Sequence, residues 1–210
     1  MKIKLLVLGL IISALACSGG TGSNSRNSSA NAEVKKGVAP AADSEIAVIE
    51  METPAFGTIK MELYSNIAPQ AVTRFKELAR AGYYDGIEFH RINETVIQAG
   101  DSNTKPGAAP RPDGKQGDSG KPNVPAEFSD VLYDAGIVGA ARLGNDVNSA
   151  NSQFFIMLKR EPQFDQKYTV FGKVIEGLGN ARTIAGAPKG QGERPAEPVR
   201  IKTIRIERKS

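Results

Sequence analysis

The sequence is poor in the residues on which disulfide and metal chemistry depend. Its 210 residues include one cysteine, Cys17, and one histidine, His90. A single cysteine excludes an intramolecular disulfide, and a lone histidine without a Cys/His cluster excludes a multi-histidine metal site. We therefore expect neither a metal nor another cofactor.

An excess of charge of one sign is also missing. The chain has 27 Lys and Arg against 23 Asp and Glu, which gives a formal net charge of +4. Loss of Lys2 and Lys4 with a cleaved N-terminal segment would reduce this charge from +4 to +2. So small an excess argues against nucleic acid as the main partner.

The most apolar run, residues 5–16, is too short to cross a membrane as a mature helix, which needs about 20 residues. It follows the basic start Met1-Lys2-Ile3-Lys4, and this pattern predicts a secretory signal peptide over residues 1–16. Ala14-Leu15-Ala16, directly before Cys17, resembles the lipobox of bacterial lipoproteins, although Ala14 stands where leucine is usual. The resemblance implies that Cys17 becomes the lipidated first residue of the mature protein.

Acyl chains on Cys17 would anchor the protein stably to a membrane. We therefore expect it in a bacterial cell envelope, and Ser18 in place of Asp would permit sorting to the outer membrane. Residues 18–45, rich in Ser, Gly, Asn and Ala, are predicted to form a flexible tether to a domain at 46–210. The alternative is an ordinary signal peptide followed by an incidental cysteine.

Apolar periodicity divides the domain into short strands and two helices. Strands are predicted at 46–51, 58–63, 86–91, 95–97, 136–141, 153–158, 168–175 and 199–206, and helices at 68–81 and 177–185. In the last strand the apolar phase slips before Ile204, which indicates a bulge. A Gly- and Pro-rich loop at 101–125 is long enough to be functional or mobile. This pattern is typical of an all-β barrel or sandwich and does not choose between them.

Arg91 and Gln98 are candidate functional residues: Arg91 ends the predicted strand at 86–91, and Gln98 directly follows the predicted strand at 95–97. If these strands pair as a hairpin, both side chains lie on one surface. Arginine offers a rigid fork of donors and glutamine a donor and an acceptor, but neither is a nucleophile. The pair therefore suits gripping a carbonyl or amide rather than cutting a bond. The alternative interpretation is an arginine paired with a surface carboxylate.

Six short blocks, spread over about residues 46–208, resemble cyclophilins in identity and order. They are Phe89-His90-Arg91, Gln98-Ala99-Gly100-Asp101, Ala126-Glu127-Phe128, Gly136-Ile137-Val138, Asn151-Ser152-Gln153-Phe154-Phe155-Ile156 and Val170-Phe171-Gly172-Lys173-Val174. The resemblance implies an eight-stranded antiparallel closed barrel capped by two helices. It also implies peptidyl-prolyl cis–trans isomerase activity on proline-containing polypeptides by a monomeric barrel.

The resemblance also implies roles for individual residues. Arg91 matches the catalytic arginine, and the other matches are to substrate-binding positions: Gln98 for a substrate carbonyl, Phe155 for the floor of the proline pocket, Phe164 and Tyr168 for its wall and polar rim, and Ala141 and Arg142 for the strand that binds the substrate backbone.

Two departures from the family pattern bear on efficiency and inhibition. The turn after Arg91 is one residue shorter, so Thr95 or Val96 stands in place of the aromatic that lines the proline pocket, and we expect Val96 to line a shallower pocket. Gln163 occupies the position of a tryptophan associated with tight cyclosporin binding, which predicts weak inhibition.

The leading functional hypothesis is an isomerase that assists folding of exported proteins in the cell envelope. A guanidinium near the prolyl nitrogen would favour the twisted amide over the planar one, so no bond need be broken. The replaced pocket aromatic favours an alternative, a proline-peptide-binding module with weak catalysis. A surface interaction protein that uses the barrel as a scaffold is the third possibility.

Overall fold

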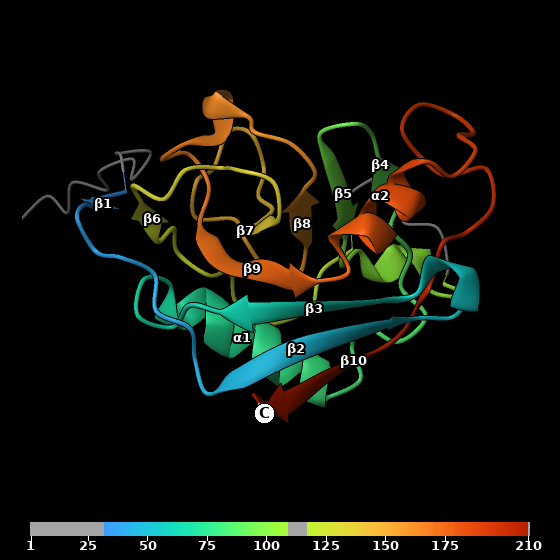
Figure 1. The fold of residues 1–210 in the computed structure, drawn as a ribbon, viewed down its shortest axis with the longest axis horizontal. Coiled ribbons are helices and arrows are strands. Elements are labelled where there is room, and N and C mark those ends of the chain that lie inside the picture. The colour runs from blue at the N-terminus through green and yellow to red at the C-terminus, as the bar shows by residue number, and fades with distance from the viewer. Residues whose placement is uncertain (1–31, 109–116, 210) are drawn as a thin grey trace, which may run out of the picture.

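The computed structural model describes residues 32–108 and 117–209. The predicted signal peptide, Cys17 and the first part of the predicted tether lie outside these ranges. The main element is an eight-stranded sheet in which all neighbouring strands are antiparallel (Figure 1). Its order is β10 (Ile201–Arg208), β2 (Glu45–Met51), β3 (Thr58–Leu63), β9 (Val170–Glu176), β7 (Ile137–Ala140), β8 (Phe154–Met157), β5 (Val96–Ala99) and β4 (Arg91–Ile92).

The sheet is an open half-barrel, so the predicted closed barrel is wrong. Its two edges are β10 and β4, and β4 has only two residues. The strand predicted at 86–91 does not form along its length: Gly86, with a φ of 77°, still belongs to the preceding turn, and β4 begins only at Arg91. Glu88 meets Arg200 only in an isolated bridge, so a few backbone bonds to the start of β10 replace a closing ladder.

Two helices pack against the sheet. α1 (Pro69–Arg80) lies against β9 and β10, and α2 (Leu178–Ala185) lies against β3 and β5. One stripe of α1 is apolar and buried, and it consists of Val72, Phe75, Leu78 and Ala79. Phe75 contacts Tyr84, Phe154 and Phe171 with ring centroids 5.3–5.5 Å apart. The helix therefore belongs to the single core cluster.

The first turn of α1 obtains its capping group from a distant part of the chain. Ala68, at the N-cap, makes no side-chain capping bond. The buried carboxylate of Glu127 instead accepts hydrogen bonds from the backbone N–H of Gln70 and of Ala71. A negative charge at this end of a helix satisfies unpaired donors and complements the helix dipole.

Most of the predicted elements are confirmed within two residues, including both helices and the strands that became β2, β3, β5, β7, β8 and β9. The predicted bulge is also confirmed, as a register shift between Ile201 and Thr203. Three short 3-10 helices connect elements at Pro54–Phe56, Ser102–Thr104 and Pro162–Phe164. Two described segments of the predicted 101–125 loop, residues 101–108 and 117–125, are joined by a hydrogen bond: the carboxylate of Asp101 accepts from the backbone N–H of Gly117. Within the described ranges, no helix has the length and apolar character needed to cross a membrane.

Residues 33–43, part of the range predicted as a flexible tether, lie against the domain and are called the strap below. β1 (Val34–Lys35) pairs in parallel with β6 (Phe128–Ser129). Further along, Asp43 accepts hydrogen bonds from Ser65 and from Lys76 on α1. The two short strands lie at the opposite end of the molecule from β4 (Figure 1).

Candidate active site

The centre of the candidate site is a row of residues that crosses four neighbouring strands. Arg91 on β4 is the register partner of Gln98 on β5, Gln98 is the partner of Phe155 on β8, and Phe155 is the partner of Gly139 on β7. Directly opposed residues in antiparallel strands point to the same face of a sheet. The predicted hairpin is therefore confirmed, with Arg91 and Gln98 on one surface.

A second row, shifted by one residue, faces the core and holds this register. It consists of Ile92, Ile97, Ile156 and Val138, all fully buried. Slipping one strand by a single residue would move its isoleucine to the outer face. The core row therefore fixes which side chains stand beside Arg91.

Phe155 lies within an aromatic cluster on the outer face of the sheet. Its ring stacks on Tyr133 at 5.8 Å and meets the rings of Phe164 and Tyr168 edge-on at 5.6 Å and 5.5 Å. Gly139 makes room for this arrangement, since a Cβ there would lie 2.8 Å from the Tyr133 hydroxyl and closer to the Phe155 ring. Phe155, Phe164 and Tyr168, which were predicted to form a pocket, do come together.

Tyr133 was not predicted, although it is buried beneath Phe155. Burial raises the pKa of its phenol well above the usual value, so the hydroxyl stays neutral. The hydroxyl has no hydrogen-bond partner among the described residues. In the sequence, Tyr133 is an isolated aromatic between Leu132 and Asp134, and this pattern does not point to a site.

Val96 is 1% exposed and follows the turn that the sequence shows to be short. It lies two residues from Gln98 on β5, so its side chain shares the face of Gln98. Its register partner on β8 is Met157. Val96 thus lies beside the predicted pocket residues but exposes almost no surface.

Arg142 lies two residues after the end of β7, next to the aromatic cluster. Its guanidinium lies 4.7 Å from the ring centre of Tyr168 and donates to the backbone carbonyls of Lys167 and Leu143. Next to it, the backbone N–H of Ala141 donates to the carbonyl of Gln153. Both predicted residues therefore border the site.

Two hollows meet over this face of the sheet. One, of about 360 Å³, is lined by residues that include Gln98, Ala141 and Asn151, and the other, of about 540 Å³, by residues that include Arg91 and Glu193. Gln98, Arg142 and Leu143 line both, so the two hollows adjoin along the predicted site, and together they are called the groove below. Phe155, which is 3% exposed, and the partly buried Phe164 and Tyr168 line neither hollow and stand beside the groove as an aromatic cluster.

The polar groups of the groove are held by hydrogen bonds. The side-chain amide of Gln98 donates to the amide oxygen of Gln153 at 2.9 Å. Arg91 Nε donates to one carboxylate oxygen of Glu193 at 2.6 Å, and Asn93 donates to the other at 2.8 Å. These hydrogen bonds lower the pKa of Glu193. Arg91 thus both stands in line with Gln98 and pairs with a carboxylate, the two arrangements that the sequence left open.

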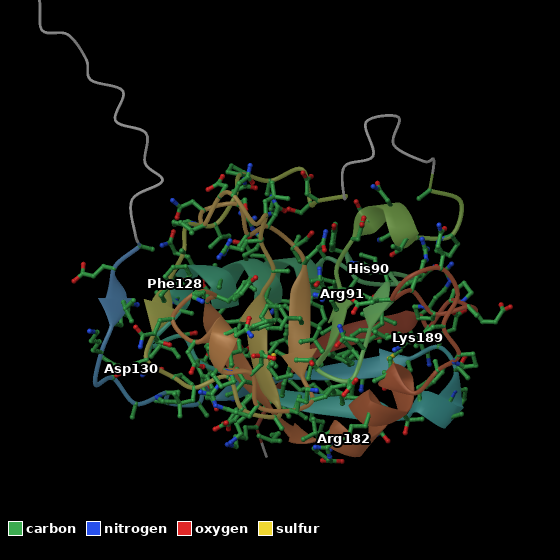
Figure 2. All side chains as sticks on the ribbon, turned by 90° about the horizontal axis from the view of Figure 1, so that it is seen from above. His90, Arg91, Phe128, Asp130, Arg182 and Lys189 are labelled. Carbon is green, nitrogen blue, oxygen red and sulfur yellow. The ribbon has the colours of Figure 1, made fainter. Side chains whose placement is uncertain are left out.

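Glu193 was missed from the sequence, because the Gly- and Pro-rich stretch around it is typical of an ordinary surface connection. His90 lines the same hollow as Arg91, and Figure 2 labels both residues in the same part of the molecule. Burial lowers the pKa of His90, which favours the neutral imidazole. Among the described residues, no group of three or more His, Cys, Asp and Glu side chains could hold a metal ion.

The sequence matches a known protein family. The family model described as cyclophilin type peptidyl-prolyl cis-trans isomerase/CLD matches residues 48–206. The peptidyl-prolyl cis-trans isomerase ppi1 of Schizosaccharomyces pombe is 37% identical over 163 residues, which cover 74% of this chain and 96% of that protein. A probable peptidyl-prolyl cis-trans isomerase of Brucella suis is 38% identical over 173 residues, 80% of this chain and 86% of that protein.

The fold is also that of solved relatives. The crystal structure of a cyclophilin-type isomerase of Cryptosporidium parvum is 28% identical, has a TM-score of 0.67, and the match covers 79% of this chain and 99% of that one. The structure of the same protein in the presence of the dipeptide Ala-Pro gives a TM-score of 0.66 with 28% identity, over 78% of this chain and 99% of that one. The chain belongs to the cyclophilin-type peptidyl-prolyl cis-trans isomerases.

Proposed function

We propose that Arg91 is the catalytic group of this isomerase, that Gln98 holds the substrate carbonyl, and that the prolyl ring lies against the aromatic cluster around Phe155. One observation carries this assignment: the cross-strand register places all three residues on one face, beside the groove. The 28% identical Cryptosporidium relative, solved with Ala-Pro, supports a proline-containing peptide as the occupant.

The chemistry required is rotation about one amide bond. The barrier is about 18–20 kcal/mol, and uncatalysed exchange of an Xaa-Pro bond takes tens of seconds or longer. In the twisted state the prolyl nitrogen is no longer conjugated with the carbonyl and becomes a hydrogen-bond acceptor. A guanidinium held near this nitrogen binds the twisted state better than the planar one, which lowers the barrier.

Each neighbouring group has a part in this binding. One N–H of the Gln98 side-chain amide donates to Gln153, which fixes the amide plane, so the second N–H has a set direction and can donate to a substrate carbonyl. Arg142 and Ala141 border the groove where the substrate chain would run beyond the proline. Neutral His90 leaves Arg91 as the charged residue of the Phe89-His90-Arg91 block at neutral pH.

Exchange spectroscopy by NMR tests the assignment directly. Exchange between the cis and trans forms of a short Xaa-Pro peptide is measured with the parent protein and with Arg91→Ala. We expect the variant to lose about 100-fold or more, the effect of removing a preorganised donor. Arg91→Ala with parental rates would refute the catalytic role of Arg91, and peptide binding without acceleration by the parent would indicate a binding module.

We also propose that the enzyme is lipid-anchored through Cys17 in a bacterial cell envelope and assists folding of exported proteins. The support is the sequence of residues 1–17, with its basic start, apolar run and terminal cysteine. Mass spectrometry of the mature N-terminus, with Cys17→Ser as control, decides the point. A mature parent without acyl mass on Cys17 that partitions into buffer without detergent would refute the proposal.

A further inference from the structure

Gly190 to Pro195, here called the edge loop, covers the open edge of the sheet beside Arg91. Its backbone carbonyl at Glu193 accepts a hydrogen bond of 2.7 Å from the backbone N–H of Ile92 on β4. The loop is closed on itself by a bond from Gly190 N–H to the carbonyl of Arg194 and by a bridge between Lys189 and Pro195. The edge of β4 is therefore paired with a loop instead of a strand.

Two neighbouring residues of the edge loop make ion pairs with the chain segment around Arg91. Arg194 pairs at 2.7 Å with Glu88, whose side chain is 4% exposed and also pairs with Arg200. The Arg194 side chain is 55% exposed and Glu88 keeps Arg200 as a second partner, so the Arg194–Glu88 contact serves as a positional anchor that ties the loop to the segment before Arg91. Glu193, next to this anchor, pairs with Arg91 and accepts from Asn93.

We infer that Glu193 is a positioning residue for catalysis: it holds the guanidinium of Arg91 by Nε and so directs the two terminal nitrogens toward the groove. This inference rests on the proposed catalytic role of Arg91. The side chain of Arg91 pairs with no described group other than Glu193. Without that carboxylate, its long side chain is free to adopt several rotamers, only some of which point into the groove.

The geometry explains why the contact acts on orientation. The guanidinium is planar and rigid, so an acceptor at Nε fixes the direction of the whole fork. Glu193 is itself fixed at three points, by its backbone carbonyl on Ile92, by its second carboxylate oxygen on Asn93 and by the adjacent anchor Arg194. A supporting residue held in this way keeps a catalytic group in a productive geometry.

The contact contributes little to the stability of the fold. The side chains of Arg91 and Glu193 are 42% and 47% exposed, and ion pairs between exposed groups are weak. Loss of Glu193 is therefore expected to change the rate of catalysis without unfolding the protein. The opposite role, in which Glu193 withdraws Arg91 from substrate, predicts a faster enzyme when the carboxylate is removed.

The test compares Glu193→Ala with Glu94→Ala in the whole protein. Glu94 lies in the turn next to Asn93 and pairs with Lys159 at 3.1 Å, so its loss removes the same charge nearby without touching Arg91. NMR line shapes of an Xaa-Pro peptide give kcat and KM separately. We expect Glu193→Ala to lose about tenfold in kcat, equivalent to about 1.4 kcal/mol, with KM and the melting temperature unchanged. Glu94→Ala should match the parent.

Two further variants separate positioning from a general structural effect. Glu193→Gln keeps an acceptor for Arg91 Nε and should recover part of the lost kcat. Combined with Arg91→Ala, Glu193→Ala should cause no additional loss, because it acts through Arg91. Parental or raised kcat in Glu193→Ala, or an equal loss in the Arg91→Ala background, would overturn the inference. An Arg91→Ala enzyme as active as the parent would instead refute the role of Arg91.

Discussion

Gly139 controls how deeply the Phe155 ring lies in the aromatic cluster, and its replacement by alanine should raise that ring. The new Cβ would stand 2.8 Å from the Tyr133 hydroxyl and closer still to Cζ of Phe155, whereas ordinary contacts begin at 3.4 Å. The Tyr133 hydroxyl must therefore retreat by about half an ångström and the Phe155 ring by more, at the 1–3 kcal/mol typical of overpacking. For a chain of this length, that corresponds to a melting temperature about 3–9 °C lower.

The effect of Gly139→Ala on function should be separable from its effect on stability. Because the ring that receives the prolyl group moves, we expect KM for an Xaa-Pro peptide to rise even well below the melting temperature. Gly179→Ala on α2 is the control, since its Cβ would meet nothing within 4 Å and alanine favours a helix. Thermal melts and NMR line shapes measure both quantities. A Gly139→Ala protein with parental melting temperature and KM would refute this account of the cluster.

Two further predictions concern stability away from the groove. Glu127→Ala removes the carboxylate that caps α1 and should cost about 1–2 kcal/mol of unfolding free energy in urea titrations; the parental midpoint and slope would contradict the capping role. At Asp43, burial alone would raise the pKa, but hydrogen bonds from Lys76 and Ser65 outweigh it, and the net pKa lies below 3.8. As the pH falls below about 4, the unfolded state therefore binds the Asp43 proton before the folded state does, and the free energy of unfolding decreases. Asp43→Asn should make the free energy of unfolding less dependent on pH in this acid range. An unchanged pH dependence would show that Asp43 does not contribute.

The sequence was informative wherever a short-range pattern decides the structure. The alternation of Ile59, Met61 and Leu63 with polar residues predicts the two faces of β3 without any knowledge of its neighbours. Arg91 and Gln98 could be paired because a hairpin brings together residues that are close in the chain. These predictions need only local periodicity and a turn, which one sequence supplies.

Contacts between distant segments were beyond such reasoning. The strap was predicted to be part of a flexible tether because the sequence of residues 18–45 is rich in small and polar residues. In the structure, however, Asp43 accepts a hydrogen bond from Lys76, 33 residues further along, and Val34 pairs with Phe128 between two short strands. Tyr133 enters the aromatic cluster only because Gly139 leaves space for its hydroxyl. Periodicity does not reveal packing of this kind, because it depends on which surfaces meet after folding.

The incorrect closed barrel and the missed Glu193 have the same physical origin. A barrel closed by strand pairing would place β10 against the outer edge of β4 and leave no room for a loop there. Residues 87–90 meet the chain before β10 only in an isolated bridge and a few backbone bonds, so that edge stays open, and the backbone of Ile92 bonds to Glu193 instead. The same loop residue then reaches Arg91 Nε. In this molecule the open edge is the reason that a carboxylate from residue 193 stands beside the candidate catalytic arginine.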